Sequence, residues 1–244
     1  MRHTPGKETA LTLKDAPISL TDHNDARTVV EDIQAEILLR ICLLDYPPGQ
    51  QLKEAAIADE FGVSRTPVRD AISRINHLGL VETRNGVGTV VVSLSADEIC
   101  QVYDMRLHLA ALVGNIEPDE VTDLQKSQAK DLLQQALALV DDFDLRTYVM
   151  LNHQLNNLIA DLINNIVLRS FWRQTYYQAA STWHQIGTIA SDKVSRSLVD
   201  ELSEISTALD ANDIRAVGYI QRVHIGYGYQ RIKTYLLQPR DVQA

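Results

Sequence analysis

Basic and hydroxyl side chains gather in the segment 62–70, which reads Gly-Val-Ser-Arg-Thr-Pro-Val-Arg-Asp. Arg65, Thr66 and Arg69 stand near the start of a helical pattern of apolar residues, and Ser64 is suited to be its N-cap. An arginine can donate two hydrogen bonds to guanine, and hydroxyl groups or helix N-terminal amides suit phosphate oxygens. The pattern predicts that the first turns of this helix contact the major groove of DNA.

A second helix precedes this one across a tight turn, and a hairpin signal follows it. The short helical run at 55–61 gives the spacing of a helix-turn-helix. Two runs typical of strands, at 80–84 and 88–92, flank the pair Asn85-Gly86, which is a strong turn signal. We expect a β-hairpin here, whose tip lies beside the duplex as a wing.

The first positioning element is an apolar helical pattern at 29–44, which the Tyr-Pro-Pro-Gly run at 46–49 ends because two prolines cannot continue a helix. The order of helix, helix, turn, helix and hairpin predicts a winged helix-turn-helix over 24–92. An ordinary three-helix packing unit with arginines on its surface fits the same pattern, since helix-turn-helix spacing alone is permissive.

From residue 96 onward the sequence shows helical periodicity only, with short breaks. We expect an all-α antiparallel bundle of six to seven helices, so the whole chain is mainly α. Ser95 is suited to cap the first of these helices. Residues 93–95 then form a linker, 1–23 a flexible polar arm and 96–238 the helical domain. The expected helices are 96–116, 118–140, 143–164, 167–187, 193–211 and 213–237.

Composition limits the class of protein. The net charge of −9 argues against a nucleic-acid binder when taken alone, but residues 62–92 hold four arginines against two acidic residues. No apolar run approaches the roughly 20 residues of a membrane helix, and the polar N-terminus lacks the apolar core of a signal peptide. Only two cysteines occur, Cys42 and Cys100, which we interpret as reduced thiols of a cytoplasmic protein.

The string Gly-Val-Ser-Arg-Thr-Pro-Val-Arg-Asp-Ala-Ile at 62–72 resembles the recognition helix of the GntR superfamily of bacterial transcription regulators. Pro-Pro-Gly at 47–49, Leu-Lys-Glu at 52–54, Gly-Leu-Val at 79–81 and Gly-x-Gly-Thr at 86–89 also match that family. Together with the C-terminal bundle, these motifs make the chain similar to the FadR-like branch, which carries an FCD effector domain.

The resemblance implies a homodimer that binds a palindromic operator in double-stranded DNA, most often as a repressor, and whose DNA affinity a small molecule alters from the helical domain. No enzymatic activity is implied. The DNA contacts that the resemblance implies are Arg65, Thr66 and Arg69 on bases or phosphates, and Ser64, Asn85 and Gly86 close to the backbone or minor groove.

The FCD family usually binds a divalent metal through an Asp-x-x-x-His pair and two later histidines. In this chain the corresponding positions are Val149, His153, Leu202 and His224, so two of four ligands are apolar. We therefore expect no metal cofactor, and if zinc or nickel does bind, His153 and His224 hold it. Arg106 matches an arginine common on the first effector helix.

In this interpretation Arg106 pairs with a carboxylate ligand, while His153 and His224 line the pocket as hydrogen-bond donors. The plainer alternatives are that both histidines are structural and that Arg106 holds Asp104 or a helix end. Two other hypotheses stay open: a constitutive regulator of the same fold that has lost its effector, and an enzyme with its site in the helical domain. For the enzyme, the sequence shows no nucleophile–base spacing and no paired carboxylates.

Overall fold

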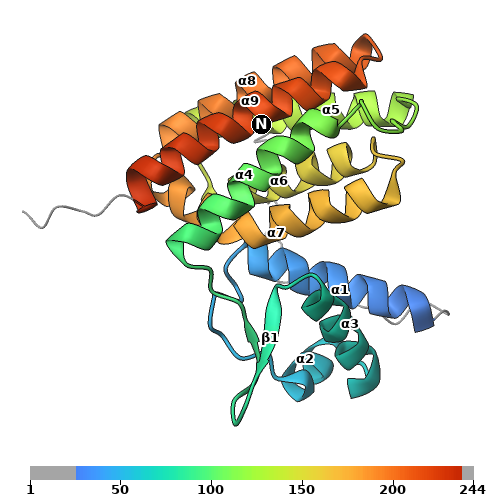
Figure 1. Cartoon of the computed structure of the whole chain (residues 1–244), viewed down its shortest axis with the longest axis vertical. Coiled ribbons are helices and arrows are strands. Elements are labelled where there is room, and N and C mark those ends of the chain that lie inside the picture. The colour runs from blue at the N-terminus through green and yellow to red at the C-terminus, as the bar shows by residue number, and fades with distance from the viewer. Residues whose placement is uncertain (1–25, 238–244) are drawn as a thin grey trace, which may run out of the picture.

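The computed structural model describes residues 26–237, and over this range the protein is mainly helical (Figure 1). The expected fold class is confirmed, because a winged helix-turn-helix with a two-stranded sheet precedes an all-α domain. The predicted arm at 1–23 lies outside the described residues. None of the helices described here is long and apolar enough to cross a membrane.

The N-terminal unit follows the predicted order of helices and strands. In the antiparallel hairpin Val81 pairs with Val91 and Arg84 pairs with Gly88. The loop before α2 adds to this sheet, since the Leu52 N–H donates to the Thr89 carbonyl over 2.9 Å. The elements are α1 (Ala26–Cys42), α2 (Glu54–Phe61), α3 (Arg65–His77), β1 (Val81–Arg84) and β2 (Gly88–Val91).

A left-handed glycine makes the turn of the helix-turn-helix. Gly62 has a φ of 65°, and the following Val63 N–H donates back to the Ala58 carbonyl over 3.0 Å, which ends α2. Ser64 occupies the N-cap position of α3 with the expected extended backbone, but among the described residues its side chain makes no capping hydrogen bond. Ser64 is exposed, and water can satisfy the first N–H groups of α3.

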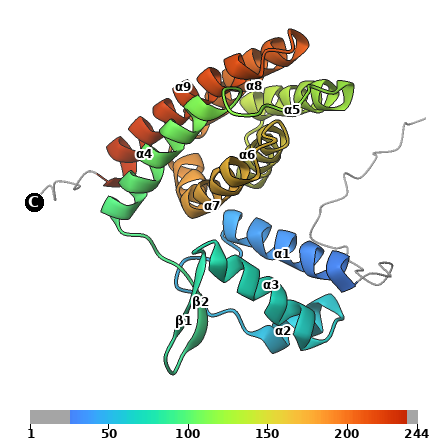
Figure 2. The same cartoon turned by 45° about the vertical axis from the view of Figure 1, so that its right-hand side comes forward.

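Helix α1 lies between the two domains. It packs against α3 on one side and against α6 and α7 of the helical domain on the other, as Figures 1 and 2 both show. Ile33 and Ile37 are fully buried as a result. The apolar residues at 29–44 therefore form two buried faces. One face packs within the N-terminal unit, and the other packs against the helical domain.

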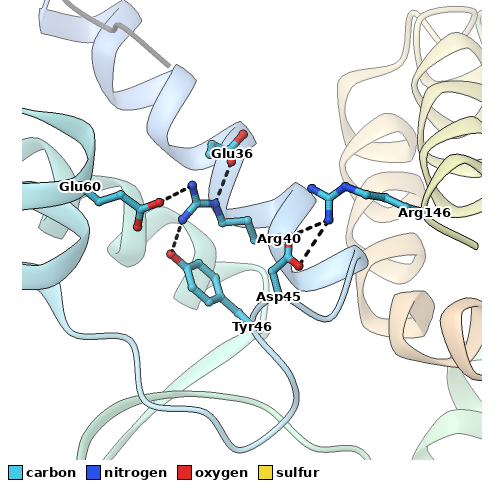
Figure 3. Close-up of polar contacts among 6 residues, drawn as sticks. All are labelled: Glu36, Arg40, Asp45, Tyr46, Glu60 and Arg146. Carbon is cyan, nitrogen blue, oxygen red and sulfur yellow. Dashed lines mark hydrogen bonds and ion pairs between the residues drawn. The ribbon is translucent and has the colours of Figure 1, made fainter. Parts of the chain in front are cut away.

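Arg40 of α1 joins three segments of the N-terminal unit (Figure 3). Its guanidinium pairs with Glu36 and with Glu60 of α2, each over 2.7 Å, and donates to the Tyr46 hydroxyl over 2.9 Å. These partners and the neighbouring rings hold the turn after α1 against α2. Next to this cluster, Arg146 of the helical domain pairs with Asp45 over 3.2 Å.

The helical domain contains the six helices that the periodicity predicts, with shifted ends. Helix α5 begins at Asp123 instead of 118, because Thr122 and Gln125 form a capping box and Pro118 instead forms a bridge with Ile163. Ser95 and Glu98 form the capping box that starts α4, as expected for Ser95. The helices are α4 (Ala96–Leu112), α5 (Asp123–Asp141), α6 (Leu145–Ala160), α7 (Ile166–Ile189), α8 (Ser191–Asp210) and α9 (Ile214–Ile232), followed by the π-helical turn Lys233–Leu237.

Helix α9 approaches the end of α4 at a glycine. A Cβ on Gly218 would overlap the Val113 carbonyl oxygen and lie 2.8 Å from that of Ala110. Gly226 lies two turns further along the same helix, and the nearest atom to its Cβ would be a Leu107 methyl at 3.8 Å. Close packing of α4 on α9 therefore requires glycine at the first position and tolerates a methyl group at the second.

We predict that Gly218→Ala destabilises the protein by roughly 1–3 kcal/mol through overpacking. The matched control Gly226→Ala is expected to be neutral or to stabilise by up to about 1 kcal/mol, since alanine favours helix more than glycine. Urea unfolding followed by circular dichroism measures both effects. Equal effects of the two substitutions would show that α9 does not approach α4 as described.

Candidate functional site

The N-terminal half of α3 presents its polar side chains to solvent. Arg65, Thr66 and Arg69 are exposed, whereas Val68 and Ala71 of the opposite face are fully buried against α1 and α2. The 3.6-residue period of α3 thus separates a packing face from a free face. The free face carries the residues that the sequence predicts for DNA contact.

Arg69 is the more restrained of the two arginines. Its Nε lies 3.3 Å from a carboxylate oxygen of Glu54, and its side chain stays 67% exposed. Surface pairs of this kind contribute little, so Arg69 can exchange Glu54 for a phosphate or a base edge. Arg65 is exposed and makes no ion pair with any residue in the described part of the chain.

The hairpin projects away from the helical domain, with Asn85 and Gly86 exposed at its tip (Figure 2). Gly86 has a φ of 75°, which a tight turn requires and glycine adopts without strain. The Gln51 side chain donates to the Val87 carbonyl and so holds the tip to the loop before α2. Both predicted contact regions therefore belong to the winged unit, at the end remote from α8 and α9.

A pocket with a cavity volume of about 40 Å³ lies between five helices of the second domain, α4, α6, α7, α8 and α9. Tyr148, Tyr176 and Trp183 supply aromatic walls. The pocket also has an unusually polar lining for an all-helical core. The polar side chains on which the argument rests are Arg106, Asn152, Asn156, Glu201, Gln221 and His224.

Arg106 is the main charged group of this pocket and is only 5% exposed. Its Nε and Nη1 atoms have no hydrogen-bond partner among the described residues. The guanidinium instead lies 5.4–5.8 Å from the ring centroids of Tyr103, Tyr176 and Trp183. Burial lowers the pKa of Arg106, and the surrounding groups only partly compensate. The alternative that Arg106 holds Asp104 receives no support, since no ion pair joins these two described residues.

Further polar atoms of the pocket are buried without partners in the part of the chain described. Both amide atoms of Asn156, the indole N–H of Trp183 and Nδ1 of His224 fall in this group. Buried polar groups are nearly always hydrogen-bonded, so several such atoms facing one cavity indicate that water or a ligand binds there. His224 is held from the other side, because its Nε2 lies 3.0 Å from Glu204.

The structure does not bring His153 together with Arg106 and His224 in this pocket. His153 instead lies beside Tyr176 and Tyr177, with ring centroids 6.1 and 5.9 Å away, and its Nε2 is 3.1 Å from the Asn157 amide. Burial, together with the nearby charge of Arg173, lowers the pKa of His153 to about 4. On α6, the pair that lines the pocket is Asn152 and Asn156.

Sequence reasoning missed this asparagine pair. The signal was present, because Asn152 and Asn156 have the same i, i+4 spacing as the Asp-x-x-x-His pair, three residues after Val149 and His153. Val149 is fully buried and is absent from the pocket wall, as is Leu202. Glu201, next to Leu202, reaches the pocket instead and accepts a 2.5 Å hydrogen bond from Gln221.

These groups do not fit zinc or nickel. Three of the polar side chains are neutral amides and one is a guanidinium, none of which is a usual ligand of these ions. Within residues 26–237 no group of three or more His, Cys, Asp or Glu side chains is arranged to hold a metal ion. The pocket is built for hydrogen bonds and charge, so no step of the function is derived through a metal.

Two family models match the chain. The model of bacterial regulatory proteins of the gntR family matches residues 29–91, and the FCD domain model matches residues 101–227, which is about half of the chain. The chain therefore belongs to the gntR family of bacterial DNA-binding transcriptional regulators, in the branch with a C-terminal FCD domain. The family expected from the sequence is confirmed, and its members are regulators rather than enzymes.

Individual relatives agree with this assignment. The chain is 26% identical over 126 residues to the uncharacterized transcriptional regulator YdhC of Bacillus subtilis, a match that covers 51% of this chain and 56% of the relative. It is 36% identical over 97 residues to the gluconate operon repressor of the same species, which covers 37% of this chain and 39% of the relative. The chain thus spans about half or less of these curated relatives.

Solved structures show the same fold. The model superposes on E. coli McbR/YncC with a TM-score of 0.63 and 17% identity, covering 83% of this chain and 98% of that one. A GntR regulator from Rhodococcus sp. RHA1 gives a TM-score of 0.62 at 21% identity, covering 86% of this chain and 98% of that one.

We predict that Arg65→Ala and Arg69→Ala each weaken operator binding by roughly 1–3 kcal/mol at fixed salt, because each removes a base or phosphate contact. Fluorescence anisotropy on a duplex selected from a random pool by the wild-type protein measures this. Arg222→Ala on the exposed face of α9 is the charge-matched control and is expected to bind as the wild type does. Unchanged operator affinity in an α3 variant would show that the substituted arginine does not contact the DNA.

We also predict that His153 makes the protein acid-sensitive. Burial holds the pKa of His153 at about 4 in the folded state, below the ordinary histidine value of about 6.5, so the unfolded chain takes up the proton first as pH falls. Stability is then lost between pH 6.5 and 4, by roughly 2 kcal/mol from this residue. His153→Gln is expected to flatten that part of the stability–pH curve. A wild-type slope in His153→Gln contradicts the burial of this imidazole.

Proposed function

We propose that this protein is a cytoplasmic, ligand-responsive transcriptional repressor. It binds a palindromic operator as a homodimer through α3 and the hairpin, and a small organic acid binds in the pocket of the helical domain without a metal ion. Ser64, Arg65, Thr66, Arg69, Asn85 and Gly86 contact the DNA in this proposal. Arg106 pairs with the carboxylate, and His224, which Glu204 holds through Nε2, contributes its Nδ1 to the pocket wall.

The observation that carries the effector half of the proposal is the state of Arg106. A buried guanidinium with two unpartnered nitrogen atoms is costly, and an anion in the adjoining cavity would give it a charge-assisted hydrogen-bond partner. His153, which the sequence suggested as a further donor, does not line that cavity, and Asn156 stands in its place. Repression is supported by relatives whose names include the gluconate operon repressors of two Bacillus species.

Helix α7 offers a route from the pocket to the DNA-binding unit. Tyr176 lines the pocket beneath Arg106, whereas Tyr177 lines a smaller cavity between the domains together with Ile41 and Leu44 of the N-terminal unit. The two tyrosine rings meet edge to face, with centroids 5.5 Å apart. A ligand that draws Arg106 away from Tyr176 shifts α7 against α1, with residues 93–95 as the covalent joint.

The homodimer is supported by an exposed apolar stripe. Tyr219, Val223 and Tyr227 recur every four residues on α9, and α4, which packs against α9, also exposes Met105 and Leu112. A second copy of the chain covers this stripe in our proposal, because a palindromic operator presents two half-sites to one winged unit each. Sedimentation velocity on the wild type and on Val223→Glu tests the assignment, and a wild-type monomer on its operator contradicts it.

We predict that Arg106→Met keeps operator affinity within about threefold but abolishes the response to organic acids. Methionine fills the buried stem without a charge, and such replacements are often neutral or stabilising, so the variant is expected to fold. The measurement is the change in melting temperature on adding a panel of carboxylates, together with anisotropy on the operator. Arg222→Met serves as the control. A full response in Arg106→Met would remove this residue from the ligand site.

A second candidate function is a constitutive regulator without an effector, motivated by the apolar side chains at two of the four metal-ligand positions. No change in stability or operator affinity with any compound of the panel would favour it.

A further inference from the structure

Arg106, Arg231 and Glu201 all line the pocket, and among them the buried Arg106 and the partly buried Glu201 carry opposite charges that do not pair with each other. These two residues lie on α4 and α8, and each charge acts electrostatically on the other. No ion pair joins these two described residues, so their charged atoms are more than 4.0 Å apart. The only hydrogen bond to the Glu201 carboxylate from a described side chain comes from the neutral Gln221.

A ligand with one charge leaves one of these groups uncompensated. A simple carboxylate satisfies Arg106 but brings its negative charge close to Glu201. An amine satisfies Glu201 and is repelled by Arg106. Burial already raises the pKa of the Glu201 carboxyl, which shows that its charge is poorly solvated where it stands.

Asn156 lies in the same pocket and can bind a ligand that carries both a negative and a positive group. It is 4% exposed, and both its Nδ2 donor and its Oδ1 acceptor are buried without partners in the described chain. An amide can donate to a carboxylate and accept from an ammonium group at once. Among the other unpartnered pocket atoms, the Trp183 indole N–H and Arg106 Nε and Nη1 are donors and suit the anionic end, and His224 Nδ1 is the remaining one.

We propose that the effector is a zwitterion of the amino-acid type, whose carboxylate binds Arg106 and whose ammonium group binds Glu201, with Asn156 between them. This inference rests on the proposed function, because it names the ligand class of the same pocket. It narrows the organic acids considered above to those that also carry a positive charge.

The test compares matched triplets of compounds. Each triplet contains an L-amino acid, the 2-hydroxy acid in which a hydroxyl replaces the ammonium group, and the amine that lacks the carboxylate. Leucine, serine and glutamine with their analogues cover apolar, small and amide side chains. Isothermal titration calorimetry on the full-length protein gives the affinities, and fluorescence of Trp183 in a Trp172→Phe background reports occupancy of this pocket.

We expect at least one amino acid to bind roughly tenfold or more tightly than both of its analogues, the factor that one charge-assisted hydrogen bond provides. Glu201→Gln should weaken binding of the amino acid by a similar factor and strengthen binding of the hydroxy acid, because it removes a like charge, whereas Arg106→Gln should weaken binding of both acids. Asp200→Asn removes the same charge from the neighbouring exposed position and is expected to bind like the wild type.

The zwitterion proposal is wrong if a hydroxy acid binds as tightly as its amino acid, or if Glu201→Gln leaves binding of the amino acid unchanged. Either outcome is still consistent with an effector pocket. Binding of organic acids without binding of amino acids would likewise contradict the zwitterion proposal alone. If no compound binds and operator affinity does not change with any of them, both the zwitterion and the effector half of the proposed function fail.

Discussion

The fold depends on the burial of α1 from two sides. This helix belongs to the DNA-binding unit by sequence, yet its fully buried isoleucines are covered by α3 on one side and by α6 and α7 on the other. Interiors are packed densely enough that a shift of one helix is passed to its neighbours. The position of α3 is therefore tied to the position of α7, which also forms a wall of the pocket. Arg40 fixes α1 to α2, so the winged unit is held to this shared helix as well.

The buried polar groups of the pocket lower the stability of the protein, and in the proposed function they bind the ligand. A guanidinium buried among three aromatic rings gains from their negative faces, but its unpartnered nitrogens still lose hydration. An apolar side chain at position 106 would give a better-packed core in the absence of ligand. The unpaired atoms of Asn156 and Trp183 have the same character. In the proposed function these polar groups are the part of the ligand site that the protein supplies.

Local patterns predicted the elements well and the pocket only in part. The helix at 65–77 and the turn at Asn85-Gly86 depend on short-range signals, namely periodicity, glycine and turn chemistry, which is why they could be predicted. Arg106 and His224 also lie where the resemblance places them, in the pocket wall. His153 does not line the pocket. Three residues turn a helix by about 300°, so the pair at 149 and 153 and the pair at 152 and 156 lie on faces only about 60° apart. Tertiary packing decides which face meets the cavity. The Ser64 hydroxyl makes no capping hydrogen bond among the described residues, since exposure to solvent removes the need for one.

The central claim is that occupancy of the pocket and binding of the operator are coupled through α7 and α1. Linkage requires that the coupling be reciprocal. The most direct measurement is the affinity of the panel compound with the largest thermal shift, determined by calorimetry once on the free protein and once on the protein saturated with selected operator DNA. The account predicts weaker ligand binding to the DNA complex, by the same factor by which the ligand weakens operator binding. Equal ligand affinity in the two states would contradict the coupling, whatever the ligand proves to be.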